Sequence, residues 1–183
     1  MPAVEQRSID MVLAERRTVE RIDAAMSVVF EKTDSEMHGD AVLDIARDGD
    51  LHMKVYTLGI LAMDLASSNG RVKSTPKLDK SRTAILTRGL RDSFFWWDLE
   101  DVTVQEGNDH LILQNATRQV VIDRKTMLPR KQTISFDDGK QLKVSYDDPA
   151  QAQGLWYPSR MKIELSRYTV TLTVREIAFR VKG

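Results

Sequence analysis

Apolar and polar residues alternate along most of this chain with a period of two. In residues 20–30, every second position carries an apolar side chain, at Ile22, Ala24, Met26, Val28 and Phe30. Successive side chains of a β-strand point to opposite faces of the sheet, so this spacing predicts a half-buried strand. The same alternation returns in residues 168–175, where threonines occupy the opposite face. Threonines there are typical of a solvated sheet surface.

Turn signals divide the alternating segments into hairpins. Asp48-Gly49 separates residues 42–46 from 51–56, Asn69-Gly70 separates 61–65 from 71–74, and Asp138-Gly139 separates 130–136 from 142–146. Asp-Gly and Asn-Gly pairs favour tight turns between antiparallel strands. About ten or eleven strands with short connections indicate an antiparallel meander rather than a parallel sheet. A sheet of this width usually curls.

One stretch does not follow the two-residue period. In residues 81–97, SRTAILTRGLRDSFFWW, apolar side chains recur at helical spacing, at Ile85, Leu86, Leu90, Phe94 and Trp97. A helix turns by about 100° per residue, so the four rings of residues 94–97 cannot all point into one core. We expect at least one ring to lie on a second apolar surface or in solvent. Two interpretations remain: an ordinary core helix, and a plug or lid over an apolar cavity.

The pattern divides the chain into consecutive parts of a single domain, residues 1–183. A narrow apolar stripe predicts an N-terminal helix in residues 1–18, and the first strands follow in residues 20–74. The lid or plug helix occupies residues 78–97, and the remaining strands occupy residues 101–181. The alternation indicates that one face of the sheet is exposed to solvent, and we expect the central helix to cover the other, concave face.

Composition excludes several classes of protein and site. The chain has 27 Lys and Arg residues against 27 Asp and Glu, which argues against a dedicated nucleic-acid binder. Because the sequence contains no cysteine, it cannot form a disulfide, a thiolate nucleophile or a cysteine zinc site. No run approaches the roughly 18 apolar residues that a membrane-spanning helix needs.

Candidate catalytic chemistry is sparse. His38, His52 and His110 show no metal-ligand spacing, and the chain has no P-loop, GxGxxG or GxSxG motif. Carboxylates follow the aromatic run at residues 98, 100 and 101, where a polar turn is a simpler interpretation than acid–base catalysis. We therefore expect no enzymatic activity, no cofactor and no metal site.

Several segments together resemble a known family. These are VVIDRKTMLPRKQTISFDDGKQLKVSYDD at residues 120–148, GLWYPSRMKIEL at 154–165 and YTVTLTV at 168–174. They are similar to the C-terminal half of the bacterial lipoprotein-carrier superfamily, which includes the LolA and LolB proteins. The shared features are the Asp-x-Lys-Thr-x-Leu-Pro turn, the Asp-Gly hairpin and the Pro-Ser-Arg start of the final strands. LHMKVYTLGILAMDLASSNG at residues 51–70 resembles the strand–Gly–strand segment of the receptor-like branch.

The resemblance implies a mainly β (α+β) fold, with the sheet curved into an incomplete β-barrel around a hydrophobic cavity. It implies binding of acyl chains of lipoproteins or phospholipids, with the membrane surface or envelope proteins as further partners. The implied location is the periplasm or the periplasmic face of the outer membrane of a diderm bacterium. That location assumes a leader or lipidated cysteine removed from the sequence. A protruding apolar loop would fall at residues 58–60.

The alternation suggests which residues would line such a cavity. The inward-facing positions are Leu43, Ile45, Met53, Val55, Leu61, Met63 and Leu65, capped by Phe94, Phe95, Trp96 and Trp97. Methionines on these faces suit variable apolar ligands, although core packing is their commoner use. Alternatively, the helix fills the interior and exposed edge strands recruit a partner, as in a structural or interaction module. A hydrolase of lipid-linked substrates would need a nucleophile and base that the sequence does not bring together.

Overall fold

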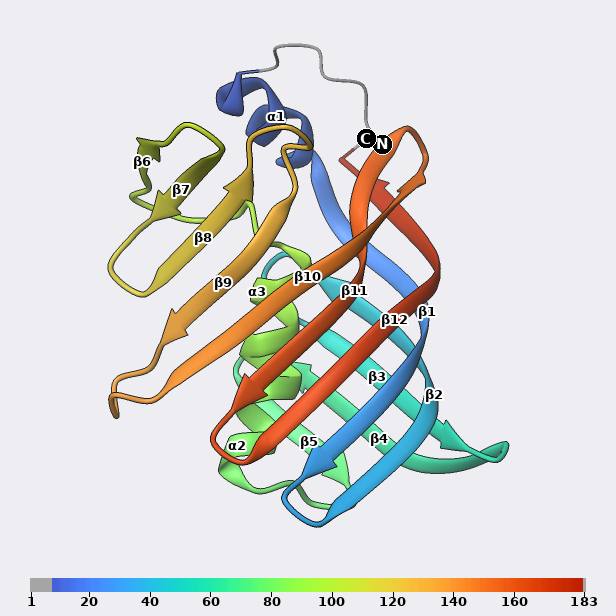
Figure 1. Ribbon diagram of the computed structural model, residues 1–183. Helices are drawn as coiled ribbons and strands as arrows, with labels where there is room; N and C mark the ends of the chain where they lie inside the picture. The colour runs from blue at the N-terminus through green and yellow to red at the C-terminus, as the bar shows by residue number, and fades with distance from the viewer. Residues whose placement is uncertain (1–7, 183) are drawn as a thin grey trace.

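The computed structural model describes residues 8–182 and shows a single curved sheet of twelve antiparallel strands (Figure 1). The first part of the expected N-terminal helix, residues 1–7, lies outside the described residues. The strands are β1 (Val19–Lys32), β2 (Ser35–Ala46), β3 (Leu51–Thr57), β4 (Ile60–Ser68), β5 (Arg71–Thr75), β6 (Thr103–Glu106), β7 (His110–Gln114), β8 (Arg118–Asp123), β9 (Pro129–Ser135), β10 (Gln141–Ala152), β11 (Leu155–Leu165) and β12 (Tyr168–Val181).

The sheet is a meander in which the first and last strands meet in the middle. Its order is β5-β4-β3-β2-β1-β12-β11-β10-β9-β8-β7-β6, so β1 pairs with β12. The two edges, β5 and β6, are not paired with each other, which leaves the barrel incomplete. The predicted fold class, a wide antiparallel sheet curved into an incomplete barrel, is therefore confirmed.

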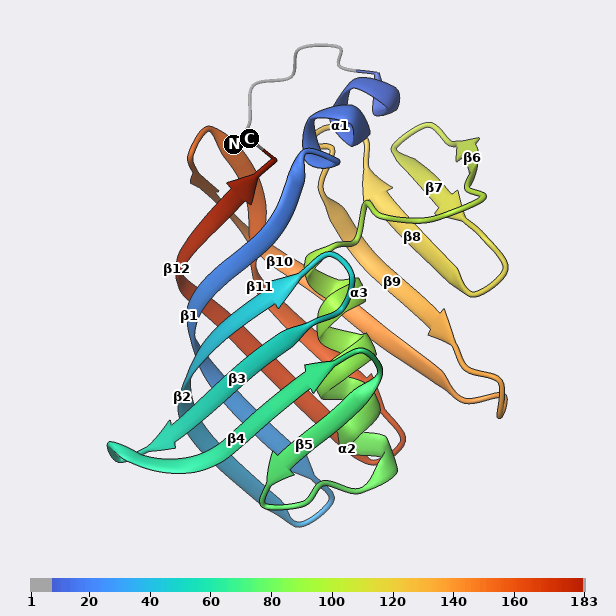
Figure 2. The ribbon, with the colours of Figure 1, turned by 180° about the vertical axis from the view of Figure 1, so that it is seen from behind.

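A helical segment connects the two edges and lies inside the curve of the sheet (Figure 2). It consists of α2 (Lys80–Ala84), the π-helical turn η1 (Ile85–Gly89) and α3 (Leu90–Phe94). Gly89 permits the close approach to the sheet, because a Cβ atom there would lie 3.0 Å from Leu142 Cδ1. The core lies between this segment and the concave face, where alternate residues of the strands are buried.

A short helix, α1 (Ile9–Arg16), covers one end of the barrel (Figure 1). Ser8 caps its N-terminus by accepting a hydrogen bond from the Met11 amide at 3.3 Å. Ile9, Val12 and Leu13 are buried. Within residues 8–182, no helix is long and apolar enough to span a bilayer.

The first hairpin is longer than the hydrophobic pattern predicts. β1 continues past Phe30 to Lys32, and β2 begins at Ser35 rather than near residue 42. Residues 31–38 are exposed at this end of the hairpin, so burial imposes no alternation on them. The paired extension, from Glu31↔Glu36 to Lys32↔Ser35, forms one wall of the cavity described next.

Candidate functional site

Six of the seven predicted lining residues of the sheet are buried in the core. Their side chains are at most 5% exposed and belong to the same cluster as the helical residues; they are Leu43, Ile45, Met53, Val55, Met63 and Leu65. Leu61 differs, because it is 48% exposed. A bulge in the β3–β4 pairing between Val55 and Tyr56 shifts the alternation by one residue, so Leu61 faces away from the interior.

All four rings of residues 94–97 are buried, at 3% exposure or less. The chain leaves helical geometry at Phe95, where φ is −103° and ψ is 50°, so the last rings are not on a regular helix. Trp96 packs edge-on against Trp97, with centroids 5.6 Å apart. The guanidinium carbon of Arg16 in α1 lies 5.1 Å from the centroid of the Trp96 ring. The helix α1 therefore supplies the expected second surface, and solvent does not reach the rings.

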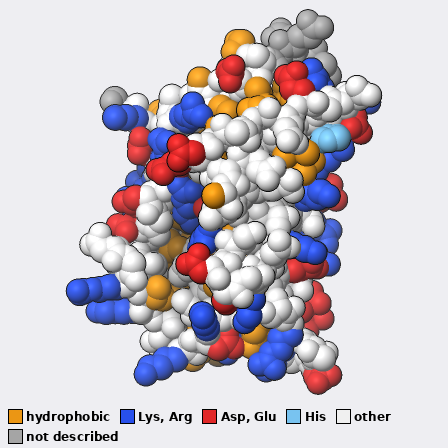
Figure 3. All heavy atoms as spheres, turned by 90° about the vertical axis from the view of Figure 1, so that its left-hand side faces the viewer, with side chains coloured by type: hydrophobic (Ala, Val, Ile, Leu, Met, Phe, Trp, Pro, Cys, Tyr) orange, Lys and Arg blue, Asp and Glu red, His pale blue; other side chains and the backbone are white. Residues whose placement is uncertain are grey.

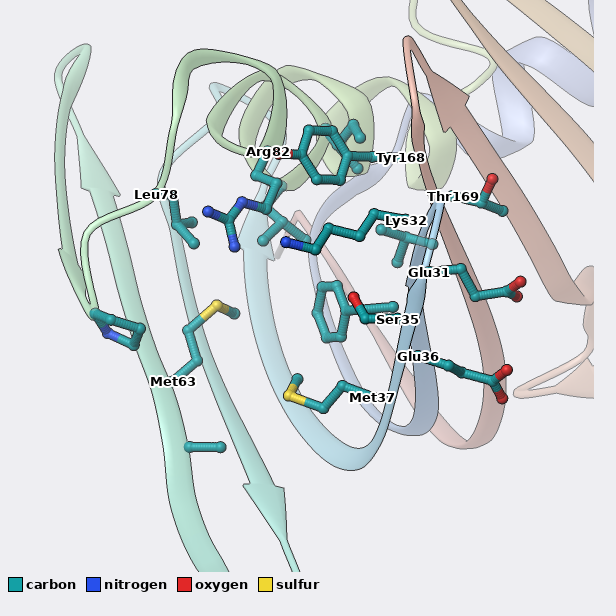
Figure 4. A pocket seen from close by; sticks show the side chains of 16 residues that line it. Glu31, Lys32, Ser35, Glu36, Met37, Met63, Leu78, Arg82, Tyr168 and Thr169 are labelled. Atoms are coloured by element: carbon teal, nitrogen blue, oxygen red, sulfur yellow. The ribbon is translucent and has the colours of Figure 1, made fainter.

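A half-open cavity of about 310 Å³ lies at the opposite end of the helical segment, beside α2 (Figure 4). Its walls come from the β1–β2 hairpin, the start of β4, the segment before α2, the first turns of the helix and the start of β12. The apolar lining residues are Phe30, Met37, Ala62, Met63, Pro76, Leu78, Ile85, Leu86, Tyr168 and Val170. The polar ones are Glu31, Lys32, Ser35, Glu36, Arg82 and Thr169.

The predicted site and the observed cavity overlap only in part. Among the described residues, Met63 is the one predicted lining residue that borders the cavity. The helical side is formed by Leu78, Arg82, Ile85 and Leu86 rather than by the four rings. The four rings are buried in the core, and the cavity lies instead where the sheet extends past the start of α2.

Buried polar side chains hold the other end of the helical segment. The last carbonyl groups of a helix have no partner within it. Arg118 of β8, only 6% exposed, donates from Nη1 to the carbonyl oxygen of Asp98 at 2.5 Å. Its Nη2 donates to the carbonyl oxygens of Asp92 and Phe95, both at 3.2 Å. A cation at a helix C-terminus also interacts favourably with the helix dipole.

Gln132 of β9 and Tyr146 of β10 complete this arrangement. Gln132 Oε1 accepts from Arg118 Nε at 2.8 Å, and its Nε2 donates to the Asp92 carbonyl at 2.9 Å. The Tyr146 hydroxyl accepts from Gln132 Nε2 at 2.9 Å and donates to the Ser93 carbonyl at 3.0 Å. Burial raises the pKa of Tyr146 above its usual value, so the hydroxyl stays protonated and continues to donate.

Charge in this cluster is compensated within the protein. Arg118 Nη1 lies 3.6 Å from the Asp92 carboxylate, whose side chain is 7% exposed. Burial lowers the pKa of Arg118, but an arginine remains charged at neutral pH. Asp98, which the sequence places in a polar turn, is bound by Arg47 at 2.8 Å and by Arg91. Burial opposes its ionisation, but the two arginines outweigh that effect and lower the pKa of Asp98.

The sequence contained signals for some of these residues. Arg118 is in phase with Val120 and Ile122, and Gln132 is in phase with Ile134, on the inward faces of β8 and β9. A polar residue at a core position indicates a buried hydrogen-bond network. Lys32 is likewise in phase with the apolar face of β1, two residues after Phe30. Arg82 lies three and four residues before Ile85 and Leu86, so it shares their face of the helix and carried a similar signal.

The histidines lie apart on the surface. His52 pairs with Asp64 at 2.8 Å and His110 with Asp109 at 2.7 Å, while His38 contacts Glu36. Over the described part of the chain, no group of three acidic or histidine side chains is placed to hold a metal ion. Lys, Arg, Asp and Glu side chains are interspersed on the face shown in Figure 3.

Comparison of the sequence with protein-family models and with curated proteins gives no match. Comparison of the structure does find similar proteins. A LolA superfamily protein from Nitrosomonas europaea is 12% identical and superposes with a TM-score of 0.62, covering 97% of this chain and 96% of that one. A DUF1329 family protein from Desulfovibrio piger is 10% identical, with a TM-score of 0.64 and coverage of 96% and 92%.

A third solved structure has the same architecture. It is a putative outer membrane lipoprotein-sorting protein domain from Vibrio parahaemolyticus, 13% identical, with a TM-score of 0.55 and coverage of 94% and 91%. These matches extend over nearly the whole of each chain, so they compare complete folds rather than a shared hairpin. The chain thus has the LolA-like fold, as the resemblance in its turns and final strands implies.

Proposed function

We propose that the protein binds acyl chains of lipids or lipoproteins, without enzymatic activity, in lipid or lipoprotein transport within a bacterial envelope. The observation that carries this proposal is the cavity of about 310 Å³, lined mainly by apolar side chains and open at one end of the barrel. Each buried CH₂ group contributes about 0.8 kcal/mol, so an acyl chain can be held without polar contacts. The description of the similar Vibrio protein as a lipoprotein-sorting domain supports the same role.

The cavity is at the low end of the size range of small-molecule sites, roughly 300–1,000 Å³. We therefore propose that it accepts one acyl chain at a time. Met37 and Met63 lie on its walls, and flexible thioether side chains can adapt to chains of different length.

Filling the cavity is expected to weaken binding. Ala62 lines it, so Ala62→Trp should lower the affinity for a fluorescent C12 fatty-acid probe at least tenfold, equivalent to about 1.4 kcal/mol. The measurement is a fluorescence titration below the critical micelle concentration. Ala66→Trp is the matched control, because Ala66 is exposed on the same strand and does not line the cavity. Equal affinities of the two variants would contradict the site assignment.

The tip of the β3–β4 hairpin is an exposed apolar surface near the cavity. Leu58, Ile60 and Leu61 are 97%, 72% and 48% exposed, and Ala62 and Met63 of the cavity follow directly on β4. The β1–β2 and β3–β4 hairpins project at the same end of the barrel (Figure 1). Exposed apolar patches often mark membrane or protein contacts. We propose that this tip touches a membrane, in the periplasm or at the outer membrane.

Charging the tip is expected to reduce membrane contact. Leu58→Asp with Ile60→Asp should lower the vesicle-bound fraction in a flotation assay about tenfold or more, because burying each such side chain contributes about 1.5–3 kcal/mol. Val104→Asp is the control: Val104 is an exposed apolar residue of β6, which Figure 1 shows at the other end. If wild type does not float with vesicles, or the double variant floats equally well, the tip is not a membrane contact.

A further inference from the structure

We infer that the cavity selects single-chain lipids with an anionic head group, a carboxylate or a phosphate, through Lys32 and Arg82. The inference rests on the function proposed above and adds the chemistry of the head group. Its basis is the direction of the charged side chains around a cavity whose walls are otherwise mostly apolar.

Four charged side chains line the cavity, and they do not point the same way. Figure 4 shows the Lys32 amine and the Arg82 guanidinium reaching into the cavity from opposite sides, from the end of β1 and from α2. The carboxylates of Glu31 and Glu36 point away from it. The lining is balanced in formal charge, but the groups that a ligand would meet are cations.

Two of the acidic groups near the cavity, Asp79 and Glu36, already have partners. Asp79 accepts from the Tyr168 hydroxyl and from the Arg82 backbone amide at 2.8 Å, and its Oδ2 lies 3.4 Å from Arg82 Nε. Glu36 contacts His38. Asp79 is thus the one described carboxylate that compensates the two cations inside, and the pair retains a net positive charge.

The cations themselves have unused hydrogen-bonding capacity. Lys32 Nζ makes no hydrogen bond or ion pair with any residue in the described part of the chain. Arg82 Nε is buried beside Asp79, but the two terminal Nη atoms of Arg82 make no hydrogen bond with any residue in that part of the chain. The Arg82 guanidinium also stacks on Tyr168, with its carbon 5.5 Å from the ring centroid. An ammonium has three donors and a guanidinium five, so an oxyanion between them would receive charge-assisted hydrogen bonds.

A lipid with an anionic head fits this arrangement better than a neutral one. The acyl chain would lie against Phe30, Met63, Ile85 and Leu86, and the head group would remain near Lys32 and Arg82. The contact between the head group and these cations lies near apolar walls, so water and salt screen it less than a contact in open solvent. We expect an anionic C12 lipid to bind about five- to tenfold more tightly than a neutral one, since each partly exposed contact contributes modestly.

The test compares laurate, dodecyl phosphate and monolaurin, all at submicellar concentration, by isothermal titration calorimetry at two salt concentrations. Wild type should bind both anions more tightly than monolaurin, and the preference should fall in high salt. Lys32→Gln with Arg82→Gln should lose the preference and keep its affinity for monolaurin. Lys143→Gln with Arg160→Gln removes the same charge from exposed positions outside the cavity and should behave as wild type.

Each outcome decides between the two proposals. Equal wild-type affinities for laurate, dodecyl phosphate and monolaurin would overturn the head-group inference and leave acyl binding intact. A preference that survives Lys32→Gln with Arg82→Gln would also overturn it. Failure of all three lipids to bind would overturn acyl binding itself. If the preference follows the two cations, the tighter of the two anions identifies the head group.

Discussion

Arg118→Met is expected to destabilise the protein by about 3–5 kcal/mol, because it leaves several buried acceptors without a donor and each costs about 1–3 kcal/mol. The substitution removes the donors to the carbonyl groups at the end of α3. It also removes one cation beside the Asp92 carboxylate, which keeps Arg91 at 3.0 Å and Arg88 at 3.5 Å. The measurement is the free energy of unfolding from a urea titration. Asp92→Asn added to Arg118→Met should recover little of the loss, because the Asp92 carboxylate keeps Arg88 and Arg91 as partners and the carbonyl groups remain without donors.

Arg160→Met is the control for this effect. Arg160 is exposed on β11, and surface substitutions of this kind usually change stability by less than about 0.5 kcal/mol. A stability of Arg118→Met within about 1 kcal/mol of wild type would show that the end of α3 does not depend on the guanidinium.

Trp96→Ala is the second large effect, at about 3–5 kcal/mol of lost stability. Trp96 is 1% exposed, contacts Trp97 edge-on and lies under the Arg16 guanidinium, so its removal leaves a void between α1 and the helical segment. The measurement is again the free energy of unfolding. Val104→Ala, a truncation at an exposed apolar position, should have little effect.

A second substitution at Trp96 distinguishes a role in core packing from a role in capping a ligand. Trp96→Phe keeps a ring in place and should retain enough stability for binding assays. Because Trp96 does not line the cavity, the Trp96→Phe variant should bind the C12 probe with the affinity of wild type. If the Trp96→Phe variant folds but loses affinity for the probe, the rings would cap the ligand, as the aromatic run in the sequence suggested.

Alternation predicted the fold well because burial on one face of an antiparallel sheet imposes a strict period of two. Met26, Met53 and Leu65 all lie where the pattern places them. The β3–β4 bulge defeats the pattern at Leu61, since one extra residue reverses every position beyond it. No local sequence signal marks that shift.

The cavity was harder to predict than the core for a physical reason. Core positions repeat, whereas the cavity forms where the β1–β2 hairpin extends past the start of α2 and its residues become exposed. The four consecutive aromatic residues from Phe94 to Trp97 suggested a lid over the cavity, because they form the most apolar stretch of the helical segment. In the structure these rings are buried near α1, and other side chains, among them Phe30 and Tyr168, line the open end.

The helical segment itself has two differently held ends. Arg118, Gln132 and Tyr146 fix its C-terminal end through buried hydrogen bonds. At its N-terminal end, Asp79 and Arg82 are about 40% exposed, so contacts there are weaker. A ligand that enters beside α2 would therefore meet the less firmly held end of the helix.

Native mass spectrometry of the protein purified from a diderm bacterial host tests the central claim, acyl binding in the cavity, most directly. We predict an adduct of one lipid mass per chain that disappears on denaturation and is strongly reduced in Ala62→Trp but not in Ala66→Trp. A mass without adduct, unchanged after incubation with fatty acid, phospholipid and acylated peptide, would contradict the account. Exposed edge strands β5 and β6 would then direct the search to protein partners.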